Sequence, residues 1–436
     1  MAGDLSRLRV SDLISRKVLA IGDGYRAKNS EMSLTGIPFA RAGNIDGGIS
    51  FNDADYIDIS AIPVPEEKIS RPGDTVFTSK GTVGRFAFVK QNTRPFIYSP
   101  QLCYWRSLDK NLIDPKYLYY WLSGAEFYTQ YKGVSGQTDM AEYVSLGDQR
   151  QMWITLPDPA DQMAIGEMLG FLDDKIDVNR RVAATLEEMS RALFKSWFVD
   201  FDPVCVQAGC RDTGLPADTA GLFPNRLGDN GLPEGWQFQP MLDQADWVNG
   251  AAYKDMHFSD APDALPVIKI AELKNGITDS TKHTNTDLGD RYKIAAGELL
   301  FSWSGSPDTS IDAFIWVNGD AWLNQHIFAV RSNGQAPLSV LFSMLKHFKP
   351  ELIEIARDKQ TTGLGHITRQ DLARLRVSLG GPDILAAFDK LTDSVFRRLQ
   401  AVLLENQKLA QLRDALLPKL ISGELRIKDA EKAVAA

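Results

Sequence analysis

A heptad pattern of apolar residues, running without proline from about Ala160 to Phe198, constrains the fold of this chain more than any other feature. The residues on one side recur at alternating steps of four and three, which is the a/d seam of a coiled coil. The seam consists of Ile165, Leu169, Leu172, Ile176, Asn179, Ala183, Leu186, Ser190, Leu193 and Trp197. Because the stripe is one-sided, the helix needs a partner that covers it.

The predicted partner is a second heptad helix in the same chain. Segment 191–194 (RALF) resembles segment 414–417 (DALL) at an offset of 223 (414 − 191). Carrying this offset along the seam gives Phe388, Thr392, Val395, Leu399, Val402, Asn406, Leu409, Arg413, Leu416 and Leu420. We expect the two helices to pair antiparallel, because the globular segment between them can carry the chain back. In that register Asn179 would face Asn406, a buried polar pair that fixes the alignment; two unrelated, solvated asparagines are the alternative.

The segments that precede the two long helices resemble each other in outline. GDTVFTS (73–79) is echoed by GELLFSW (297–303), and WITL (153–156) by RVSL (376–379), in the same order and at nearly the same spacing. The predicted organisation is a first domain 1–158, a long helix 159–200, a linker 201–231, a second domain 232–381, a long helix 382–425 and a tail 426–436. The predicted fold class is α+β, with two tandem domains and an antiparallel coiled coil of pseudo-two-fold symmetry.

This organisation predicts a two-part binding site. A helix of about 36 residues is roughly 55 Å long, so the paired helices would set a fixed distance between the domains. Two similar but non-identical domains related by a two-fold suit an asymmetric DNA target, with the half-sites read on opposite strands.

Composition limits the class of protein. The net charge of −8 argues against a nucleic-acid binder whose whole surface is basic, so a DNA-binding face would be local or shared with a partner. No apolar run approaches the length of a membrane span, and we expect no membrane association. Three cysteines in 436 residues favour a reducing cytoplasm. Cys205 and Cys210 lack a second pair at zinc-ligand spacing, so no metal site is predicted.

Three places in each domain could read DNA. The first is the turn after the GD/GE strand, the second a polar glycine loop, and the third an early strand end. The candidate residues are Arg41, Ser79, Lys80, Thr82, Arg85, Gln137 and Thr138 in the first domain, and Lys269, Ser302, Trp303, Ser304, Ser306, Thr362 and His366 in the second. Such side chains could contact phosphates or base edges. A solvated hairpin, a plain loop and a framework strand are the respective alternatives.

Local charge favours the first of these places. Between positions 71 and 106 the cations Arg71, Lys80, Arg85, Lys90, Arg94 and Arg106 are accompanied by one acid, Asp74. In the second domain, basic and acidic residues are mixed. We therefore expect weak intrinsic affinity for DNA, supplemented by partner subunits.

A search for catalytic motifs finds one weak candidate. The chain has no GxxxxGK[ST] phosphate loop and no Asn/Asp-Pro-Pro-aromatic run. Asp263, Glu272 and Lys274 mimic a metal-dependent nuclease motif, so a stand-alone DNA nuclease is one alternative function. A structural coiled-coil adaptor without DNA binding is another.

Four segments carry a resemblance to a known family: LPDPADQMAIGEML (156–169), LDDKIDVNRRVAATLEEMSRALFKSWFVDFDPV (172–204), NGLPEGW (230–236) and LLENQKLAQLRDALLPKLISGEL (403–425). On these segments the chain resembles the specificity subunit of type I restriction–modification systems over essentially its whole length. The start of the first domain, RLRVSDLIS, lacks the tryptophan present at Trp236.

The resemblance implies two target-recognition domains joined by an antiparallel helical spacer. It also implies assembly on double-stranded DNA with two modification (methyltransferase) subunits and with ATP-dependent restriction subunits. S-adenosylmethionine, ATP and Mg²⁺ are then expected on those partners, and this chain is expected to hold no cofactor and to be non-catalytic by itself.

Overall fold

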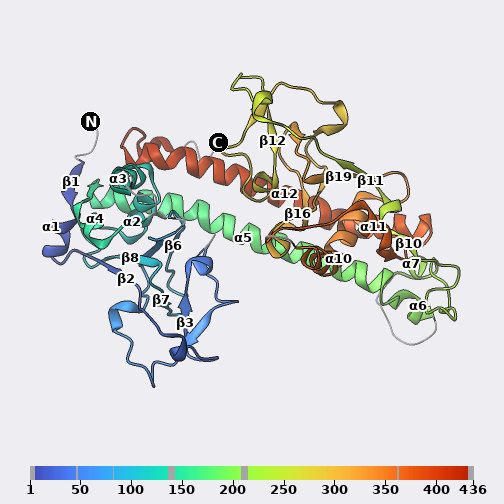
Figure 1. Ribbon diagram of the computed structural model, residues 1–436, viewed down its shortest axis with the longest axis horizontal. Helices are drawn as coiled ribbons and strands as arrows, with labels where there is room; N and C mark the ends of the chain where they lie inside the picture. Colours follow the sequence, from blue (N-terminus) through green and yellow to red (C-terminus); the bar gives the residue numbers. More distant parts are fainter. Residues whose placement is uncertain are drawn as a thin grey trace. The chain divides into compact units, whose positions relative to one another are not determined.

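The computed structural model describes residues 5–45, 48–81, 83–135, 143–207, 215–360 and 363–430. The chain forms two compact units (Figure 1). Unit 1 consists of Met1–Ile176 and Leu409–Ala436, and unit 2 of Asp177–Lys408. Unit 2 is thus contiguous in sequence, whereas unit 1 is completed by the C-terminal part of the chain.

Unit 1 is built on a four-stranded antiparallel sheet and a smaller three-stranded sheet. Its elements are β1 (Ser6–Arg9), α1 (Val10–Ser15), β2 (Leu19–Asp23), β3 (Ile37–Ala40), β4 (Asp55–Ile57), β5 (Thr75–Thr78), β6 (Phe86–Phe88), β7 (Ile97–Tyr98), β8 (Leu102–Ser107), α2 (Pro115–Leu122), α3 (Ala125–Ser135), α4 (Leu146–Gln151) and β9 (Trp153–Leu156). The larger sheet has the order β2-β8-β5-β6, the smaller one β4-β3-β7, and β1 pairs with β9. Trp105, Tyr117, Trp121 and Phe127 fill the core between the larger sheet and helices α2 and α3.

Unit 2 repeats this plan. Its elements are α6 (Asp202–Gln207), α7 (Ala217–Ala220), β10 (Gln239–Pro240), β11 (Asp246–Asn249), β12 (Leu265–Ile268), α8 (Ile270–Asn275), β13 (His283–Thr284), β14 (Lys293–Ile294), β15 (Leu299–Ser302), β16 (Ser304–Gly305), α9 (Pro307–Ser310), β17 (Asp312–Ile315), β18 (Ala321–Leu323), β19 (Ile327–Arg331), α10 (Leu338–Asp358), β20 (Gly365–His366), α11 (Arg369–Arg374) and β21 (Arg376–Val377). The sheets have the orders β11-β19-β15-β17 and β13-β12-β18-β14, and β10 pairs with β21.

The two units share topology down to single hydrogen bonds. In each, one sheet contains a parallel pair: β3 with β7 in the three-stranded sheet of unit 1, and β12 with β18 in the four-stranded sheet β13-β12-β18-β14 of unit 2. Helices α4 and α11 begin with the same capping box, Ser145 with Asp148 and Thr368 with Asp371, at the offset of 223 (368 − 145). These shared features support the predicted duplication.

One glycine in each unit marks a close backbone crossing. A Cβ atom on Gly24 would lie 1.9 Å from the carbonyl oxygen of Ser99, and one on Gly250 would lie 2.2 Å from that of Asn324. Only glycine fits at either position, because the obstacle is backbone.

The two heptad segments form the long helices α5 (Pro159–Phe198) and α12 (Pro382–Ile421), coloured green and red in Figure 1. Each has 40 residues. Every predicted seam residue is buried or half-buried on both helices. In unit 2 the Trp197 ring lies 5.3 Å from the Phe388 ring, while Asn179 contacts Glu405. Numbers rise on one helix as they fall on the other, so the helices are antiparallel. The predicted α+β class with two tandem domains and two long paired helices is confirmed.

In unit 1 the remaining halves of the two helices also pack together. Arg413 Nη1 donates to Asp173 Oδ1 at 2.7 Å, and both side chains are about three-quarters buried. Ile165, Leu169 and Leu172 belong to the same core cluster as Leu416 and Leu420. Arg413, a polar interruption of the predicted seam, is therefore neutralised by an acid on the facing helix.

The described parts of the predicted linker 201–231, residues 201–207 and 215–231, belong to unit 2 and contribute to its core. Phe201, Val204 and Phe223 are buried in the core cluster that also contains Trp197 and Trp236. The segment contains the short helices α6 and α7. The buried apolar residues of this segment, Phe201, Val204 and Phe223, are spaced irregularly, which explains why its sequence shows no heptad period.

Candidate nucleic-acid interface

Two polar segments of unit 1, predicted as separate places, meet in one backbone arrangement. Ser79 N–H donates to the Gln101 carbonyl at 2.9 Å, and the Val144 N–H donates to the Ser79 carbonyl at 3.0 Å. Lys80 then forms an antiparallel bridge with Tyr143. The turn after β5 and the end of the polar loop before α4 therefore lie side by side. We call Lys80, Gln101 and Tyr143 the polar edge of unit 1.

Unit 2 has the same arrangement. Trp303 N–H donates to the His326 carbonyl at 3.3 Å, and the Ile367 N–H donates to the Trp303 carbonyl at 2.8 Å. Strands β16 and β20 pair Ser304 with His366. We call Trp303, Ser304, His326 and His366 the polar edge of unit 2.

The two edges carry different side chains on the same backbone. In unit 1, Lys80 is exposed and Tyr143 is 52% exposed. In unit 2, His326 and His366 are exposed, and the half-buried Trp303 ring lies 5.6 Å from the His326 ring. Trp303 Nε1 donates to Asn249 Oδ1 at 2.9 Å, which holds the indole in place. An exposed cation and a phenol in one unit thus correspond to a hydroxyl and an imidazole in the other.

Two of the predicted residues are buried and support the edges from below. Ser79 is 1% exposed, and its hydroxyl donates to the Gln101 carbonyl at 3.3 Å. Ser302 is fully buried at the end of β15, and its hydroxyl has no hydrogen-bond partner among the described residues. Neither side chain can reach a ligand outside the protein, so both are framework residues.

Arg41 and Lys269 occupy equivalent strand ends that are capped by the next turn. The Arg41 N–H donates to Asn44 Oδ1 at 2.8 Å, and the Arg41 guanidinium pairs with Asp55 at 2.6 Å. Lys269 is exposed, and its ammonium lies 5.5 Å from the Phe258 ring. Because Asp55 partly offsets the charge of Arg41, the attraction of this strand end for DNA is weaker than the sequence indicates.

The other predicted residues are placed as follows. Arg85 N–H donates to Thr78 Oγ1 at 3.2 Å, and its Nη1 donates to the Ala42 carbonyl at 3.3 Å. Ser306 is half-buried immediately before α9, and its carbonyl accepts from the Ser310 N–H at 2.8 Å. Thr82, Gln137, Thr138 and Thr362 lie outside the described residues.

The predicted basic stretch of unit 1 is largely neutralised within the fold. Arg106 is 8% exposed and binds fully buried Asp74 through Nε at 2.6 Å and Nη2 at 2.7 Å. The Tyr98 hydroxyl donates to Asp74 at 2.6 Å, and burial together with this carboxylate raises the pKa of Tyr98 well above its usual value. The interpretation of Arg106 as a surface cation is therefore wrong.

Two further cations of this stretch are also paired. Arg71 contacts Glu66 at 2.7 Å, and Lys90 contacts Asp174 at 2.9 Å. Arg94 donates to the Gly36 carbonyl at 2.7 Å. Lys80 has no ion pair within the described part of the chain, so it is the cation that the stretch presents at the polar edge.

The nuclease-like residues have structural roles. Glu272 is 8% exposed and caps α8: its Oε2 accepts from the Lys269 N–H at 2.9 Å and its Oε1 from Thr281 Oγ1 at 3.2 Å. Asp263 accepts from Asn285 Nδ2 at 3.1 Å. Among the described residues no group of three or more His, Cys, Asp or Glu could hold a metal ion. The nuclease alternative is not supported.

The buried polar contact between the long helices of unit 2 differs from the predicted pair by one residue. Asn179 is 2% exposed, and its Nδ2 donates to Glu405 Oε2 at 2.9 Å. Asn406 Oδ1 is buried without a hydrogen-bond partner in the described structure. The longer side chain of Glu405 reaches across the seam from a flanking position and satisfies the Asn179 amide.

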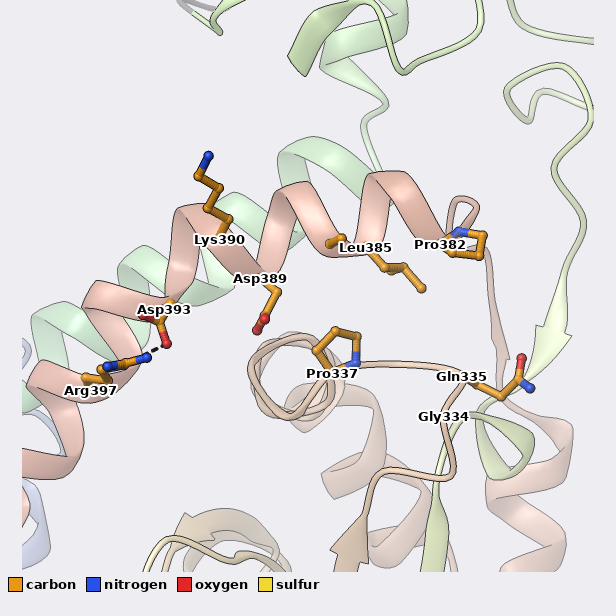
Figure 2. Close-up of a pocket in the computed structure, with 10 residues that line it drawn as sticks. Gly334, Gln335, Pro337, Pro382, Leu385, Asp389, Lys390, Asp393 and Arg397 are labelled. Atoms are coloured by element: carbon orange, nitrogen blue, oxygen red, sulfur yellow. Dashed lines mark hydrogen bonds and ion pairs between the residues drawn. The ribbon is translucent and has the colours of Figure 1, made fainter. Parts of the chain in front are cut away.

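One groove of about 410 Å³ lies between the beginnings of α10 and α12 in unit 2 (Figure 2). Its lining includes Pro337, Leu385 and Lys390, and Arg397 Nε donates to Asp393 Oδ1 at 2.9 Å along its rim. None of the predicted DNA-reading residues lines it.

Sequence reasoning missed Tyr143 and His326 as edge residues. Tyr143 follows a loop, and His326 lies in the turn between β18 and β19. Neither position belongs to a helix or strand whose hydrophobic period could have marked it. The internal repeat was the available signal, since Ser79 contacts Gln101 where Trp303 contacts His326, at offsets of 224 (303 − 79) and 225 (326 − 101). Separately, no helix in the described ranges is long and apolar enough to cross a membrane.

Comparisons with known proteins agree with the sequence resemblance. Residues 26–188 match the family model described as the type I restriction modification DNA specificity domain. The specificity subunit of the type I restriction enzyme HindI from Haemophilus influenzae is 21% identical, covering 94% of this chain and 99% of the relative. The MjaIX specificity subunit from Methanocaldococcus jannaschii is 23% identical, covering 83% of this chain and 80% of the relative.

A solved structure agrees as well. The crystal structure of the type I restriction–modification system S subunit from M. genitalium has a TM-score of 0.50 and 13% identity, covering 96% of both chains. At this identity the match shows the fold alone. The predicted resemblance of this chain to type I specificity subunits is confirmed.

Proposed function

We propose that this chain, which resembles type I specificity subunits over nearly all of its length, is the sequence-specific DNA-recognition subunit of a type I restriction–modification complex. The observation that carries the proposal is the recurrence of one backbone edge with two sets of side chains. A single backbone holding Lys80 and Tyr143 in one unit, and Ser304 and His366 in the other, suits two different half-sites of one bipartite, asymmetric target.

The chemistry of the edges fits contact with duplex DNA. A lysine ammonium binds a phosphate or the N7 and O6 acceptors of guanine, and hydroxyl or imidazole groups can donate to or accept from base edges in the major groove. Each edge continues from a buried strand end, at Ser79 in unit 1 and at Ser302 in unit 2. With a net charge of −8, the chain alone should bind DNA weakly and depend on its partners.

The same proposal assigns catalysis to other subunits. The relatives are named as subunits of type I restriction enzymes, and we propose that this chain assembles with modification subunits that hold S-adenosylmethionine and with ATP-dependent restriction subunits. On α5, Met163 and Phe171 are 53% and 65% exposed and lie about two helical turns apart. This apolar pair in unit 1 is our candidate contact for a modification subunit.

A domain exchange tests the proposal. The segment 232–381 is replaced by the corresponding segment of a relative, the complex is expressed, and methylated adenines are mapped across the host genome. We expect a bipartite motif with one modified adenine on each strand, of which the exchange alters one half only. An unchanged motif would favour the structural adaptor, and DNA cleavage by the isolated chain with Mg²⁺ would favour an enzyme.

A further inference from the structure

An exposed tryptophan on the outer two-stranded sheet of unit 1 is flanked by two arginines. Trp153 is 41% exposed, although its neighbours Met152 and Ile154 are buried. Arg9 stands directly opposite Trp153 in the β1–β9 ladder, and Arg7 stands opposite Thr155. Because alternate residues of a strand share a face, Arg7, Arg9 and Trp153 lie on one face of the sheet.

The arginines are arranged around the indole. The guanidinium carbons of Arg7 and Arg9 lie 5.8 Å and 6.0 Å from the Trp153 ring centroid, within the range of a cation–π interaction. Arg9 Nη2 also donates to the side chain of Gln151. We call Arg7, Arg9 and Trp153 the Arg–Trp platform.

The platform is held from its outer edge. Trp153 N–H donates to Gln130 Oε1 at 2.8 Å, and Gln130 Nε2 donates back to the Trp153 carbonyl at 2.7 Å. Gln130 of helix α3 thereby occupies both backbone groups of Trp153 on the outer edge of β9, so no further strand can pair with Trp153 there. What remains available is the face with its side chains.

The charge of the platform is not balanced locally. Neither Arg7 nor Arg9 forms an ion pair with any residue in the described ranges. The Glu126 carboxylate, on the same side of the sheet, accepts hydrogen bonds from Thr155 Oγ1 at 2.9 Å and from Trp121 Nε1 at 2.7 Å. Two guanidiniums that are pre-oriented by one aromatic ring and form no ion pair among the described residues suit a ligand with regularly spaced negative charge. Arginine forks match phosphate oxygens in geometry.

The platform is specific to unit 1. In unit 2 the equivalent ladder pairs Pro240 with Arg376, so a proline stands in place of Arg9 and an arginine in place of Trp153. In unit 1, residues 144–152, which include the six-residue helix α4, separate Trp153 of the platform from Tyr143 of the polar edge along the chain. The phosphates that flank the bound site of a duplex at that edge are a polyanion with the regular charge spacing that the platform fits.

We propose that the Arg–Trp platform binds two backbone phosphates of the DNA that flanks the half-site read by unit 1. The inference rests on the proposed function but goes beyond it, since the platform makes no contact with bases and adds affinity without sequence preference. The second half-site has no equivalent contact, so the footprint of the protein is longer on one side of its target.

The test measures DNA affinity of the assembled modification complex as a function of salt, for Arg7→Ala, Arg9→Ala and the double variant. Each lost phosphate contact lowers the slope of log K against log[salt] by about 0.9, so the double variant should lower it by about 1.8. The methylation motif should remain that of the parent. Ethylation of phosphates flanking the first half-site should no longer interfere with binding, while interference at the second half-site persists.

A charge-matched control is the variant Arg16→Ala with Lys110→Ala, which also removes two exposed cations from unit 1. It should leave the slope unchanged. Should the double platform variant fold poorly, exposed Arg7→Ala alone lowers the slope by about 0.9, and Arg9→Lys, which keeps the charge, retains it.

Two outcomes overturn the inference. If the slope is unchanged in every platform variant, the platform does not bind DNA. An unchanged slope with loss of co-purifying modification subunit assigns the platform to an acidic protein surface instead. A different result is that the unmodified complex methylates no bipartite motif at all. That result would refute the proposed function, not the role of the platform.

Discussion

The buried ion pair of unit 1 should be among the most sensitive points of the fold, and its counterpart in unit 2 provides an internal control. Asp74 accepts hydrogen bonds from the Arg71 N–H, from two nitrogens of Arg106 and from the Tyr98 hydroxyl, at 2.6 to 2.7 Å. Asp74→Ala would leave the Arg106 charge buried and uncompensated. Breaking a buried pair in this way costs about 3–5 kcal/mol of unfolding free energy.

The equivalent residues of unit 2 are less buried. Glu298 accepts from the Ala295 N–H and from Arg331 Nε, both at 2.9 Å, with side-chain exposures of 24% for Glu298 and 34% for Arg331. Water can solvate Arg331 once its partner is removed, so Glu298→Ala should cost only about 1 kcal/mol. The difference between the two variants reflects the deeper burial of the Asp74 pair together with its two additional hydrogen bonds, from a second Arg106 nitrogen and from Tyr98.

Urea unfolding of the full chain, followed by tryptophan fluorescence and circular dichroism, measures both variants. Adding Arg106→Met to Asp74→Ala should recover part of the loss, because the buried charge is then absent. The reasoning would be refuted if Glu298→Ala destabilised the protein as much as Asp74→Ala, or if Arg106→Met gave no recovery.

Three further predictions concern unit 2 and the outer face of α5. Burial, followed by the charges of Arg191 and Lys195, lowers the pKa of His347, so the folded state disfavours protonation of this side chain. The free energy of unfolding should therefore fall as pH drops below about 6.5, the ordinary pKa of histidine. His347→Gln should flatten this pH dependence in unfolding curves measured at several pH values. Gly250→Ala should cost about 1–3 kcal/mol and weaken reading of the second half-site, whereas Gly319→Ala, where the added methyl group meets open space, should do neither in thermal melts and methylation mapping. Phe171→Asp should leave the melting temperature unchanged but reduce co-purification of the modification subunit, and full co-purification would exclude Phe171 from that contact.

The long helices could be predicted from the sequence because burial and period coincide there. The apolar positions of a heptad repeat mark the side of the helix that becomes buried. Leu169 and Leu399 could therefore be assigned to the seam from the sequence, and both are fully buried. The register of the two helices was harder to predict. Asn179 bonds Glu405 instead of Asn406, because the flexible Glu405 side chain reaches inward from one position off the seam. The heptad period of the sequence does not show this.

The candidate site was only partly predictable. The turn and the glycine loop were recognisable as polar segments, but their pairing joins Ser304 to His366, 62 positions later (366 − 304), and depends on the whole intervening domain. Charge counting misplaced Arg106, because a sequence does not show that a cation faces a buried carboxylate. Ser302 and Ser304 are two positions apart, yet the first is a strand residue within the sheet and the second belongs to the edge.

The discontinuity of unit 1 has a consequence for biosynthesis. Unit 2 is encoded by one uninterrupted stretch and can fold while the ribosome is still working, whereas the first 176 residues must wait for Leu409 and beyond before Ile165, Leu169 and Leu172 are covered. A nascent chain therefore presents an apolar seam until synthesis ends. Premature termination before Leu409 would yield a product whose second unit is intact and whose first unit is incomplete, and such a product should be removed by proteolysis or aggregate.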